Sequence, residues 1–358
     1  YQNDTVYNVV LQNDSVTNVN IQMYSLTPIN ISLETILSTD NSILSDIDFL
    51  IENADFSYSG TTNSNGTFII NNLIPGTYDI YAGSWGLNEY CNEQINISDG
   101  LQPIVIPLDN GYSDRFNLDM NWITTFSSPA GKWVRDIPIG TTFNNGPCNP
   151  SYDSPDCGNK AFITGNAPGQ PWIDDVDQGF VKLSSPIISL DPSQTNYINC
   201  SIWWKNLGNN TALNDSLQIL VTDNINSENL LIATSSNQYE WKDTSLLLPN
   251  SINLSSFHVE IITADWSTGS GSGDLVEAGF DDFSITNSPL SIEDGLNKIK
   301  QVIVYPNPTS NGMVFLKGFD SNMEYQIYNL AGKLIQTKNE SFIHLKNRGV
   351  YILKIKSG

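Results

Sequence analysis

Apolar residues in this chain occur in short runs, and inside many runs they alternate with polar residues. The stretches INISLETIL at 29–37 and YINCSIWW at 197–204 are examples. Gly, Pro, Asn and Asp separate the runs, most densely between residues 131 and 190. A period of two between turn-forming residues predicts β-strands, whereas an amphipathic helix repeats its apolar positions every three or four residues. The sequence therefore predicts an all-β protein.

The clearest runs fall into two groups, separated by a polar stretch near residue 110. The first group predicts strands at Ile29–Leu37, Ile47–Ile51, Phe56–Tyr58, Thr67–Ile70, Thr77–Ala82 and Ile104–Leu108. The second group predicts strands at Tyr197–Trp204, Leu217–Thr222, Leu230–Ala233, Phe257–Thr263 and Phe280–Ile285. Short strands at this spacing are typical of β-sandwiches. We interpret the stretch 109–114 between the groups as a hinge.

Charge changes sharply near residue 290, which predicts a domain boundary there. Residues 1–290 hold seven Lys or Arg and 33 Asp or Glu, a charge of −26; residues 291–358 hold nine and five, a charge of +4, which together give −22. A chain of 358 residues is long enough for two or three domains. We expect three tandem β-sandwich domains at 28–112, 113–288 and 303–358. Leading strands or an upstream remnant would fill 1–27, and a linker 289–302.

The negative charge argues against some classes of partner. A net charge of −22 disfavours nucleic acid and anionic membrane surfaces. No run of 18 apolar residues occurs, so we expect no membrane span. This excess of acidic over basic residues suits an exported protein or one that binds divalent cations.

Cysteine spacing gives a second indication of export. Cys148 and Cys157 lie nine positions apart in a Pro-, Gly- and Asn-rich stretch. We predict a disulfide between them, which would stabilise the fold by about 2–3 kcal/mol if unstrained. Four cysteines without CxxC spacing argue against zinc, and an oxidising compartment fits best. Cys91 and Cys200 lie in strand-like runs, and we expect both to be buried free thiols.

Acidic residues gather in one loop of the central region. Asp175 and Asp177 could ligate Ca²⁺ together with Glu277, Asp281 or Asp282, which lie at the last strand of the same domain. The set that we predict is Asp175, Asp177, Glu277 and Asp282. Ca²⁺ would then fix the positions of loops rather than catalyse. The alternative is that the acidic loop is solvated and caps its own backbone, and that the Asp281-Asp282 pair forms a turn.

Catalytic motifs are scarce in the sequence. His258 and His344 are the only histidines and fall in different predicted domains, which argues against a zinc site and a Ser-His-Asp triad. GxGxxG, P-loop and HExxH motifs are absent. We therefore expect no enzyme in this chain. One alternative stays open, a carboxylate pair for glycoside hydrolysis drawn from Asp174, Asp177, Glu277 and Asp282.

Two tryptophans are candidates for ligand contact. Trp172 and Trp266 lie in loops rich in Pro, Gly and Ser, where an indole can stack on a sugar ring. Packing in the core is the commoner place for tryptophan, and it remains the alternative. Trp203 and Trp204 are neighbours on one predicted strand, so one should face the core and the other outward.

Three stretches resemble known families. Asn65-Gly66-Thr67-Phe68 and Pro75-Gly76-Thr77-Tyr78 resemble the carboxypeptidase regulatory-like (transthyretin-like) domain, which is a folded spacer without chemistry. The central region resembles the MAM-like or concanavalin-like jelly roll of secreted Bacteroidota proteins. The stretches that carry this second resemblance are Gly131–Arg135, Pro138–Thr141, Phe162–Asn166, Asp175–Asp177, Leu183–Pro186, Trp203–Trp204 and Glu277–Phe283.

The third resemblance is the most specific. Tyr305-Pro306-Asn307-Pro308, Gly332 within YNLAGK, and Gly349 with Tyr351 in GVYILKI resemble the type A C-terminal sorting domain of type IX (Por) secretion. The resemblance implies a small Ig-like sandwich that acts as a secretion signal. It also implies export across the outer membrane to the cell surface or beyond, with the translocon and its outer-membrane shuttle proteins as partners.

Together these features predict a secreted or cell-surface binding or adhesion protein, without catalysis, whose ligand is a glycan or a surface protein. One alternative is the accessory region of a secreted metallopeptidase whose catalytic domain would precede Tyr1. Another is a structural surface component.

Overall fold

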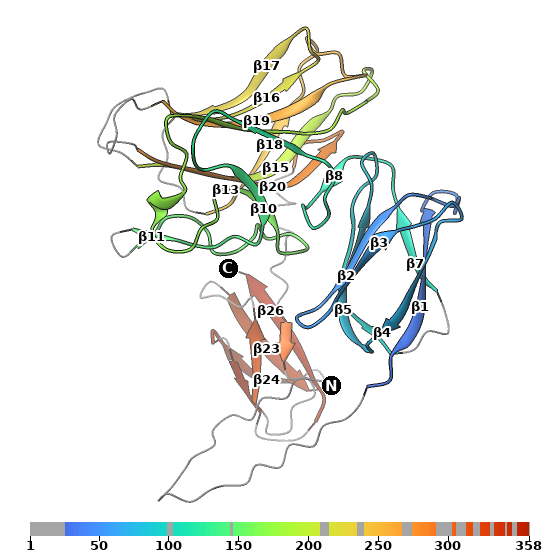
Figure 1. The fold of residues 1–358 in the computed structure, drawn as a ribbon. Coiled ribbons are helices and arrows are strands. Elements are labelled where there is room, and N and C mark those ends of the chain that lie inside the picture. Colours follow the sequence, from blue (N-terminus) through green and yellow to red (C-terminus); the bar gives the residue numbers. More distant parts are fainter. Residues whose placement is uncertain are drawn as a thin grey trace, which may run out of the picture. The chain divides into compact units, whose positions relative to one another are not determined.

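The fold is built from β-strands, which confirms the predicted class (Figure 1). The computed structural model describes residues 26–98, 103–143, 146–207, 215–234, 240–266, 274–290, 303–305, 313–317, 323–329, 333–340, 342–345 and 349–357. Among them the only helix is one 3₁₀ turn, η1 (Pro171–Ile173), and none could cross a membrane. The predicted leading strands at 1–27 lie almost wholly outside the described residues. The chain divides into two compact units, Tyr1–Pro289 and Leu290–Gly358.

Two sheets form the first sandwich. Their strands are β1 (Ile29–Leu37), β2 (Asp48–Glu52), β3 (Ser57–Thr61), β4 (Thr67–Leu73), β5 (Gly76–Gly83), β6 (Tyr90–Ile97) and β7 (Ile104–Leu108). The strand orders are β4-β1-β7 and β3-β2-β5-β6, with β1 and β7 parallel. Buried residues of both sheets, among them Leu33 and Ile51, form one core. The alternating pattern predicted every strand except β6, which is mostly polar and lies at a sheet edge.

The central sandwich follows within the same unit. Its strands are β8 (Ser113–Asp114), β9 (Ile123–Phe126), β10 (Trp133–Asp136), β11 (Thr142–Phe143), β12 (Gly146–Pro147), β13 (Ala161–Thr164), β14 (Gly179–Ser184), β15 (Tyr197–Leu207), β16 (Ser216–Thr222), β17 (Ser227–Ala233), β18 (Lys242–Leu247), β19 (His258–Asp265) and β20 (Leu275–Thr286). One sheet has the order β10-β13-β20-β15-β18, with β8 beside β20. The other has the order β17-β16-β19-β14-β9. A large apolar core lies between them.

The outer face of the β20 sheet is covered by protein rather than water. Trp204 belongs to the core and Trp203 points to the opposite face, as predicted for neighbours on a strand, but Trp203 is also buried, at 1% exposure. Its ring lies over Gly279, and Trp241 packs edge-on against it at 6.4 Å between ring centres. The Trp241 indole N–H in turn donates to the Tyr152 carbonyl at 2.9 Å. The long segment before β13 therefore contributes to covering this face.

An aromatic cluster joins the first sandwich to the central one. Trp85, just after β5, stacks on Phe283 at 6.1 Å and meets Trp122 edge-on at 5.9 Å. Its indole N–H donates to the Ile187 carbonyl at 2.8 Å. The hinge predicted at 109–114 is therefore wrong: within this stretch β8 pairs with β20, and the stretch joins two packed bodies. Local polarity suggested the hinge, because the contacts that hold the stretch come from distant residues.

The predicted disulfide is also wrong. Cys157 pairs with Cys91 of β6, 66 residues earlier, and the bond links the two sandwiches. Cys148 is a buried free thiol, as is Cys200, for which the prediction is confirmed, whereas the free thiol predicted at Cys91 is wrong. Spacing along the chain favoured the near partner, whereas the fold brings the distant strand to Cys157.

The second unit contains a smaller pair of sheets. Their strands are β21 (Ile303–Tyr305), β22 (Met313–Lys317), β23 (Met323–Asn329), β24 (Leu334–Lys338), β25 (Phe342–His344) and β26 (Tyr351–Ser357). The orders are β21-β22-β25 and β24-β23-β26, around a core that includes Val314 and Tyr325. Of the predicted secretion-signal residues, Tyr305, Gly349 and Tyr351 fall within the described part, whereas Pro306, Asn307, Pro308 and Gly332 lie outside it.

We expect Gly279→Ala to destabilise unit 1 by about 1–3 kcal/mol, because an added methyl group overpacks a filled site. A Cβ at this position would stand 2.0 Å from Trp203 Nε1 and 2.7 Å from a ring carbon of Trp241. Urea unfolding followed by tryptophan fluorescence measures the loss. Gly76→Ala is the matched control, since its Cβ would meet nothing closer than 3.5 Å. Equal stability of the two variants would contradict the packing described here.

Candidate metal centre

The outer face of β20 carries a row of side chains that would be exposed if nothing covered them. Alternate residues point to this face, and each lies opposite a residue of β15: Glu277 opposite Lys205, Gly279 opposite Trp203, and Asp281 opposite Ser201. Between successive members the intervening residues Ala278 and Phe280 enter the core. The period of two along the strand thus places two carboxylates, Glu277 and Asp281, under the covering segment.

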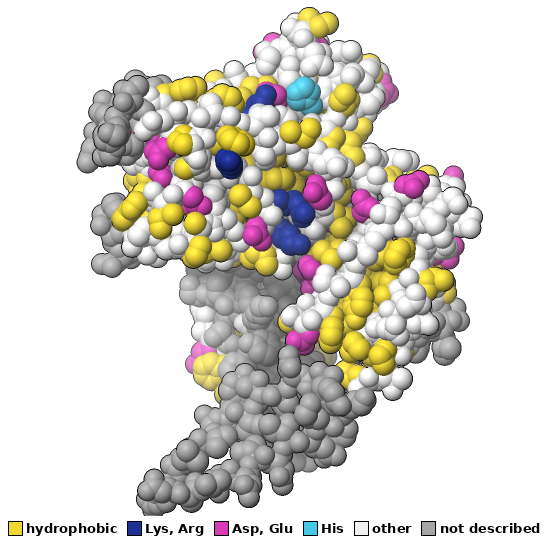
Figure 2. Space-filling model, in the orientation of Figure 1, with side chains coloured by type: hydrophobic (Ala, Val, Ile, Leu, Met, Phe, Trp, Pro, Cys, Tyr) yellow, Lys and Arg dark blue, Asp and Glu magenta, His cyan; other side chains and the backbone are white. Residues whose placement is uncertain are grey.

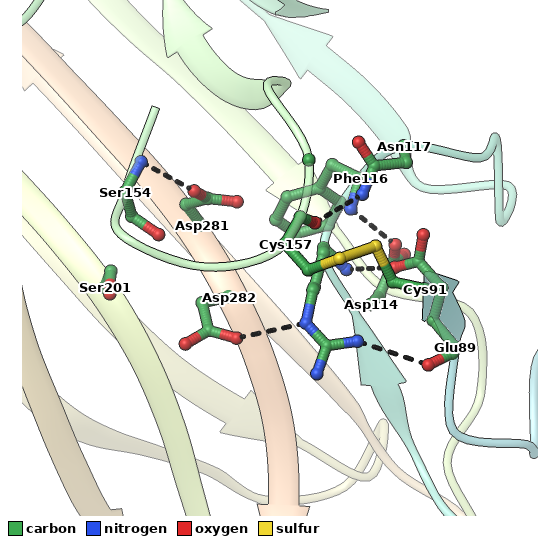
Figure 3. Close-up of polar contacts among 12 residues, drawn as sticks. Glu89, Cys91, Asp114, Phe116, Asn117, Ser154, Cys157, Ser201, Asp281 and Asp282 are labelled. Atoms are coloured by element: carbon green, nitrogen blue, oxygen red, sulfur yellow. Dashed lines mark hydrogen bonds and ion pairs between the residues drawn. A yellow bond between two sulfur atoms is a disulfide. The ribbon is translucent and has the colours of Figure 1, made fainter. Parts of the chain in front are cut away.

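Three carboxylates meet at one end of this row. Asp153 and Asp156, from the covering segment, and Asp281, from β20, each offer an oxygen, and these oxygens lie within 4.8 Å of one another. Asp281 is fully buried, and the carboxylate oxygens of all three residues are hidden from solvent. Figure 3 shows Asp281 beneath the loop that carries Ser154 and Cys157. Three negative charges this close repel strongly unless a cation or protons separate them.

Most of these buried oxygens have no donor in the described part of the chain. The Ser154 N–H donates to Asp281 Oδ2 at 3.2 Å. The other oxygen of Asp281, both oxygens of Asp153 and Asp156, and the Ser154 hydroxyl accept no hydrogen bond from described residues. Burial, and then the charge of Asp281, raises the pKa of Asp153 to about 11 and that of Asp156 to about 10. Orphaned buried oxygens of this kind call for a ligand or for protons.

A bulge in β20 sets Asp281 apart from its neighbour. Asp282 and Phe283 together lie opposite the single residue Cys200, and Asp282 adopts a positive φ of 47°. The extra residue lets Phe283 enter the core while Asp281 keeps the outer face. Asp282 instead turns to Arg115, with 3.9 Å between its Oδ1 and the guanidinium Nε.

Arg115 also holds the end of the first sandwich. Its backbone N–H donates to Glu89 Oε2 at 2.5 Å, and its Nη1 donates to the Glu89 carbonyl at 3.2 Å (Figure 3). Burial raises the pKa of Glu89 to about 7. Asp114 lies nearby and is fully buried; it accepts from the Phe116 N–H and the Trp122 indole, and burial followed by the charge of Glu89 raises its pKa.

The structure divides the predicted calcium ligands between separate places. Glu277 lies near Asp175, and burial followed by the Asp175 charge raises the pKa of Glu277 to about 8. Asp177 lies just before β14, and burial followed by the charge of Asp265, which pairs with Gly179 of that strand, raises the pKa of Asp177. Asp282 does not join them, because five residues of extended strand from Glu277 span about 17 Å. No single ion can contact both Glu277 and Asp282.

The sequence interpretation missed Asp153 and Asp156. They lie in SYDSPDCGN, where turn-forming residues are so dense that each Asp resembles a simple turn cap. A usable signal was present in the last strand: AGFDDFSI places two acidic residues inside an apolar run. Charged residues are rarely buried without a partner, so this run predicts a buried partner for one of them.

The trio fits a hard divalent cation. Carboxylates are the ligands that Ca²⁺ prefers, and the ion takes about six to eight oxygens, some of which can come from main-chain carbonyls or water. Asp153, Asp156 and Asp281 would supply the charged ligands, and the Ser154 hydroxyl lies beside them. Mg²⁺ demands a stricter octahedron and keeps most of its water, which suits a sealed site less well.

The two tryptophans predicted to contact ligand lie at the surface. Trp172 in η1 is 55% exposed, and Trp266 at the end of β19 is 46% exposed. Gly179 pairs with Asp265, so the segment after η1 and the end of β19 meet at the same end of the sandwich. The Trp266 ring is tilted against Phe180 at 6.4 Å, and its backbone N–H donates to Asp215 at 3.0 Å.

Charges on the outer face of the second central sheet are paired. Glu260 Oε1 accepts from Lys182 Nζ at 2.6 Å and lies 3.4 Å from His258 Nε2. On the face drawn in Figure 2 the basic side chains are few and stand close to acidic ones, with apolar side chains scattered between them. This face therefore offers no continuous basic surface for a polyanion.

Comparison with known families identifies the last part of the chain. A family model described as a secretion system C-terminal sorting domain matches residues 303–358. The chain is thus exported by type IX secretion and ends at the cell surface or in the medium. A search of curated proteins finds no match.

Solved structures show only weak similarity. The K1 cleaved adhesin domain of Lys-gingipain from Porphyromonas gingivalis W83 is 14% identical, with a TM-score of 0.32 over 50% of this chain and 99% of that domain. A family 11 carbohydrate-binding module of a cellulosomal cellulase of Clostridium thermocellum is 12% identical, with a TM-score of 0.28 over 49% and 92%. At these values neither similarity carries a conclusion about ligand.

Glu277 should make stability depend on pH. Its folded pKa of about 8 lies above the usual 4.5, so the neutral form stabilises the fold, and this contribution disappears as pH rises from about 4.5 through 8. Between pH 5 and pH 8 the free energy of unfolding should fall more in wild type than in Glu277→Gln, by at least about 1.4 kcal/mol. Urea unfolding in EDTA at both values measures it, with the exposed Asp191→Asn as control. Parallel losses in all three proteins would contradict the assignment.

Proposed function

We propose that this chain is a non-catalytic extracellular binding protein, in which two fused sandwiches present a ligand surface and the last domain directs export. The match of residues 303–358 to a sorting domain is the observation that carries the proposal, because it puts the chain in contact with the outside of the cell. The alternative, an accessory region of a secreted metallopeptidase, draws no support from the fold or from the comparisons.

The state of the buried carboxylates supports a structural rather than a catalytic role. Asp281 and Glu277 are buried at 0% and 3% exposure, beneath a covering segment. A glycoside hydrolase needs both carboxyl groups at a cleft that the sugar can enter. Carboxylates sealed from solvent suit an ion that holds loops in place. We therefore propose Ca²⁺ at Asp153, Asp156 and Asp281, in place of the set predicted from the sequence.

The proposed ligand surface is the end of the central sandwich that bears Trp172 and Trp266. Exposed indoles cost free energy in water, and they serve best where a sugar ring or an apolar partner group covers them. The acidic balance of the chain disfavours polyanionic ligands. A neutral or amino-bearing glycan is the ligand class that we propose, with a surface protein as the second candidate.

Ca²⁺ binding tests the metal centre. We expect one ion per chain by isothermal titration calorimetry, and stabilisation of about 2.7 kcal/mol when free Ca²⁺ is 100 times its Kd. Asp281→Asn should weaken binding at least about tenfold, because it removes a charged ligand from a buried site. Asp191→Asn should bind like wild type, since Asp191 only caps an exposed turn. Binding that Asp281→Asn leaves intact would exclude this centre.

A glycan array tests the ligand surface. Trp172→Ala and Trp266→Ala should each reduce binding to the best glycan by about tenfold or more, through lost stacking. Ile225→Ala removes another exposed apolar side chain, in the turn between β16 and β17, and serves as control. Unchanged melting temperatures establish that the variants fold. An array with no bound glycan, followed by capture of a surface protein at the same tryptophans, would favour the second candidate.

A further inference from the structure

The loop 153–160 contributes both to the carboxylate trio and to the junction with the first sandwich. Its first half supplies Asp153 and Asp156 to the carboxylate trio. Its second half contacts the first sandwich through three successive links, which are the Cys157–Cys91 disulfide, the Gly158 N–H donating to Glu93 Oε1 at 3.2 Å, and Lys160 Nζ at 4.0 Å from Glu52 Oε1.

The two halves are joined by adjacent residues. Asp156 and Cys157 are consecutive, so their Cα atoms are about 3.8 Å apart. Any ligand that fixes the Asp156 carboxylate therefore limits where the Cys157 sulfur can move. Asn117 adds a second restraint from the central sandwich, because its amide donates to the Cys157 carbonyl at 2.9 Å.

Repulsion within the trio would act on the same loop. Without a cation the three carboxyl groups lose the ion that would hold them together, and any that ionise repel one another, so the loop rather than the strand residue Asp281 is the part that would yield. Among the described residues, the hydrogen bond from the Ser154 N–H to Asp281 Oδ2 holds this half of the loop to β20. Cys91 and Cys157 are half-buried and line one pocket, and displacement of the loop would expose Cys157 further and release its neighbours from Glu93 and Glu52.

We infer that cation occupancy at Asp153, Asp156 and Asp281 governs how firmly the disulfide side of the junction is held, so that the ion and the disulfide lock the two sandwiches together. The inference rests on the cation centre proposed above. The other side of the junction does not depend on the ion, because the contacts of Trp85 with Phe283 and Trp122 are apolar.

Reduction of the disulfide tests this lock in the full-length chain. Dithiothreitol breaks the S–S bond and transfers two electrons and two protons, which leaves Cys91 and Cys157 as thiols and the reagent as its cyclic disulfide. Alkylation and peptide mapping separate these thiols from Cys148 and Cys200. Calorimetry on the same samples measures Ca²⁺ binding independently.

With Ca²⁺ at ten times its Kd, we expect reduction to be slower than in EDTA by up to about tenfold, because reduction through the displaced loop must first release the ion. Asp156→Asn should remove this difference, and Asp191→Asn should keep it; circular dichroism establishes that both fold. Equal rates in Ca²⁺ and EDTA, with Ca²⁺ binding measured, would overturn the lock and leave the cation centre standing. Absence of Ca²⁺ binding would overturn both.

Discussion

The register between β15 and β20 is the constraint on which unit 1 depends. It sends Ala278 and Phe280 into the core and leaves Glu277 and Asp281 on the outer face, under a covering segment. A slip by one residue would bury the carboxylates in the core and expose the aromatic ring. The bulge at Asp282 then corrects the period, so that Phe283 reaches the aromatic junction with Trp85. One strand thus contributes to the core, the trio and the contact between sandwiches.

A shortage of cationic side chains shapes the rest of this unit. Residues 1–290 contain seven Lys and Arg against 33 acidic residues. Arg115 contacts both Glu89 and Asp282, so its charge is divided between these residues rather than directed at the trio. Buried carboxylates without such partners either keep their protons or hold a metal ion. An acidic chain that works outside the cell meets Ca²⁺ there, which makes the second solution available.

The sequence predicted what local pattern controls and failed where distant contacts decide. Ile29–Leu37 and Ile104–Leu108 were predicted to the residue, because alternation and flanking turns are local signals. The burial of Trp203 could not be predicted, since it depends on Trp241, which packs against its ring and is itself bonded to the distant Tyr152 carbonyl. Asp281 was considered both as a calcium ligand and as half of a turn pair, and the two loop aspartates that meet it were not singled out. For the same reason Cys157 was assigned its near neighbour rather than Cys91.

The disulfide has a consequence for how this chain must fold. A nine-residue loop between Cys148 and Cys157 closes more readily in an unfolded chain than the native loop, whose ends are 66 residues apart. Shielding of Cys148 before oxidation would favour the native pairing, and in the finished fold Cys148 is fully buried. The order of folding then matters, because burial of Cys148 within the central sandwich leaves Cys157 to pair with the distant Cys91. A chain oxidised earlier would form the Cys148–Cys157 crosslink, and exchange with the Cys91 thiol would then be needed to reach the native bond.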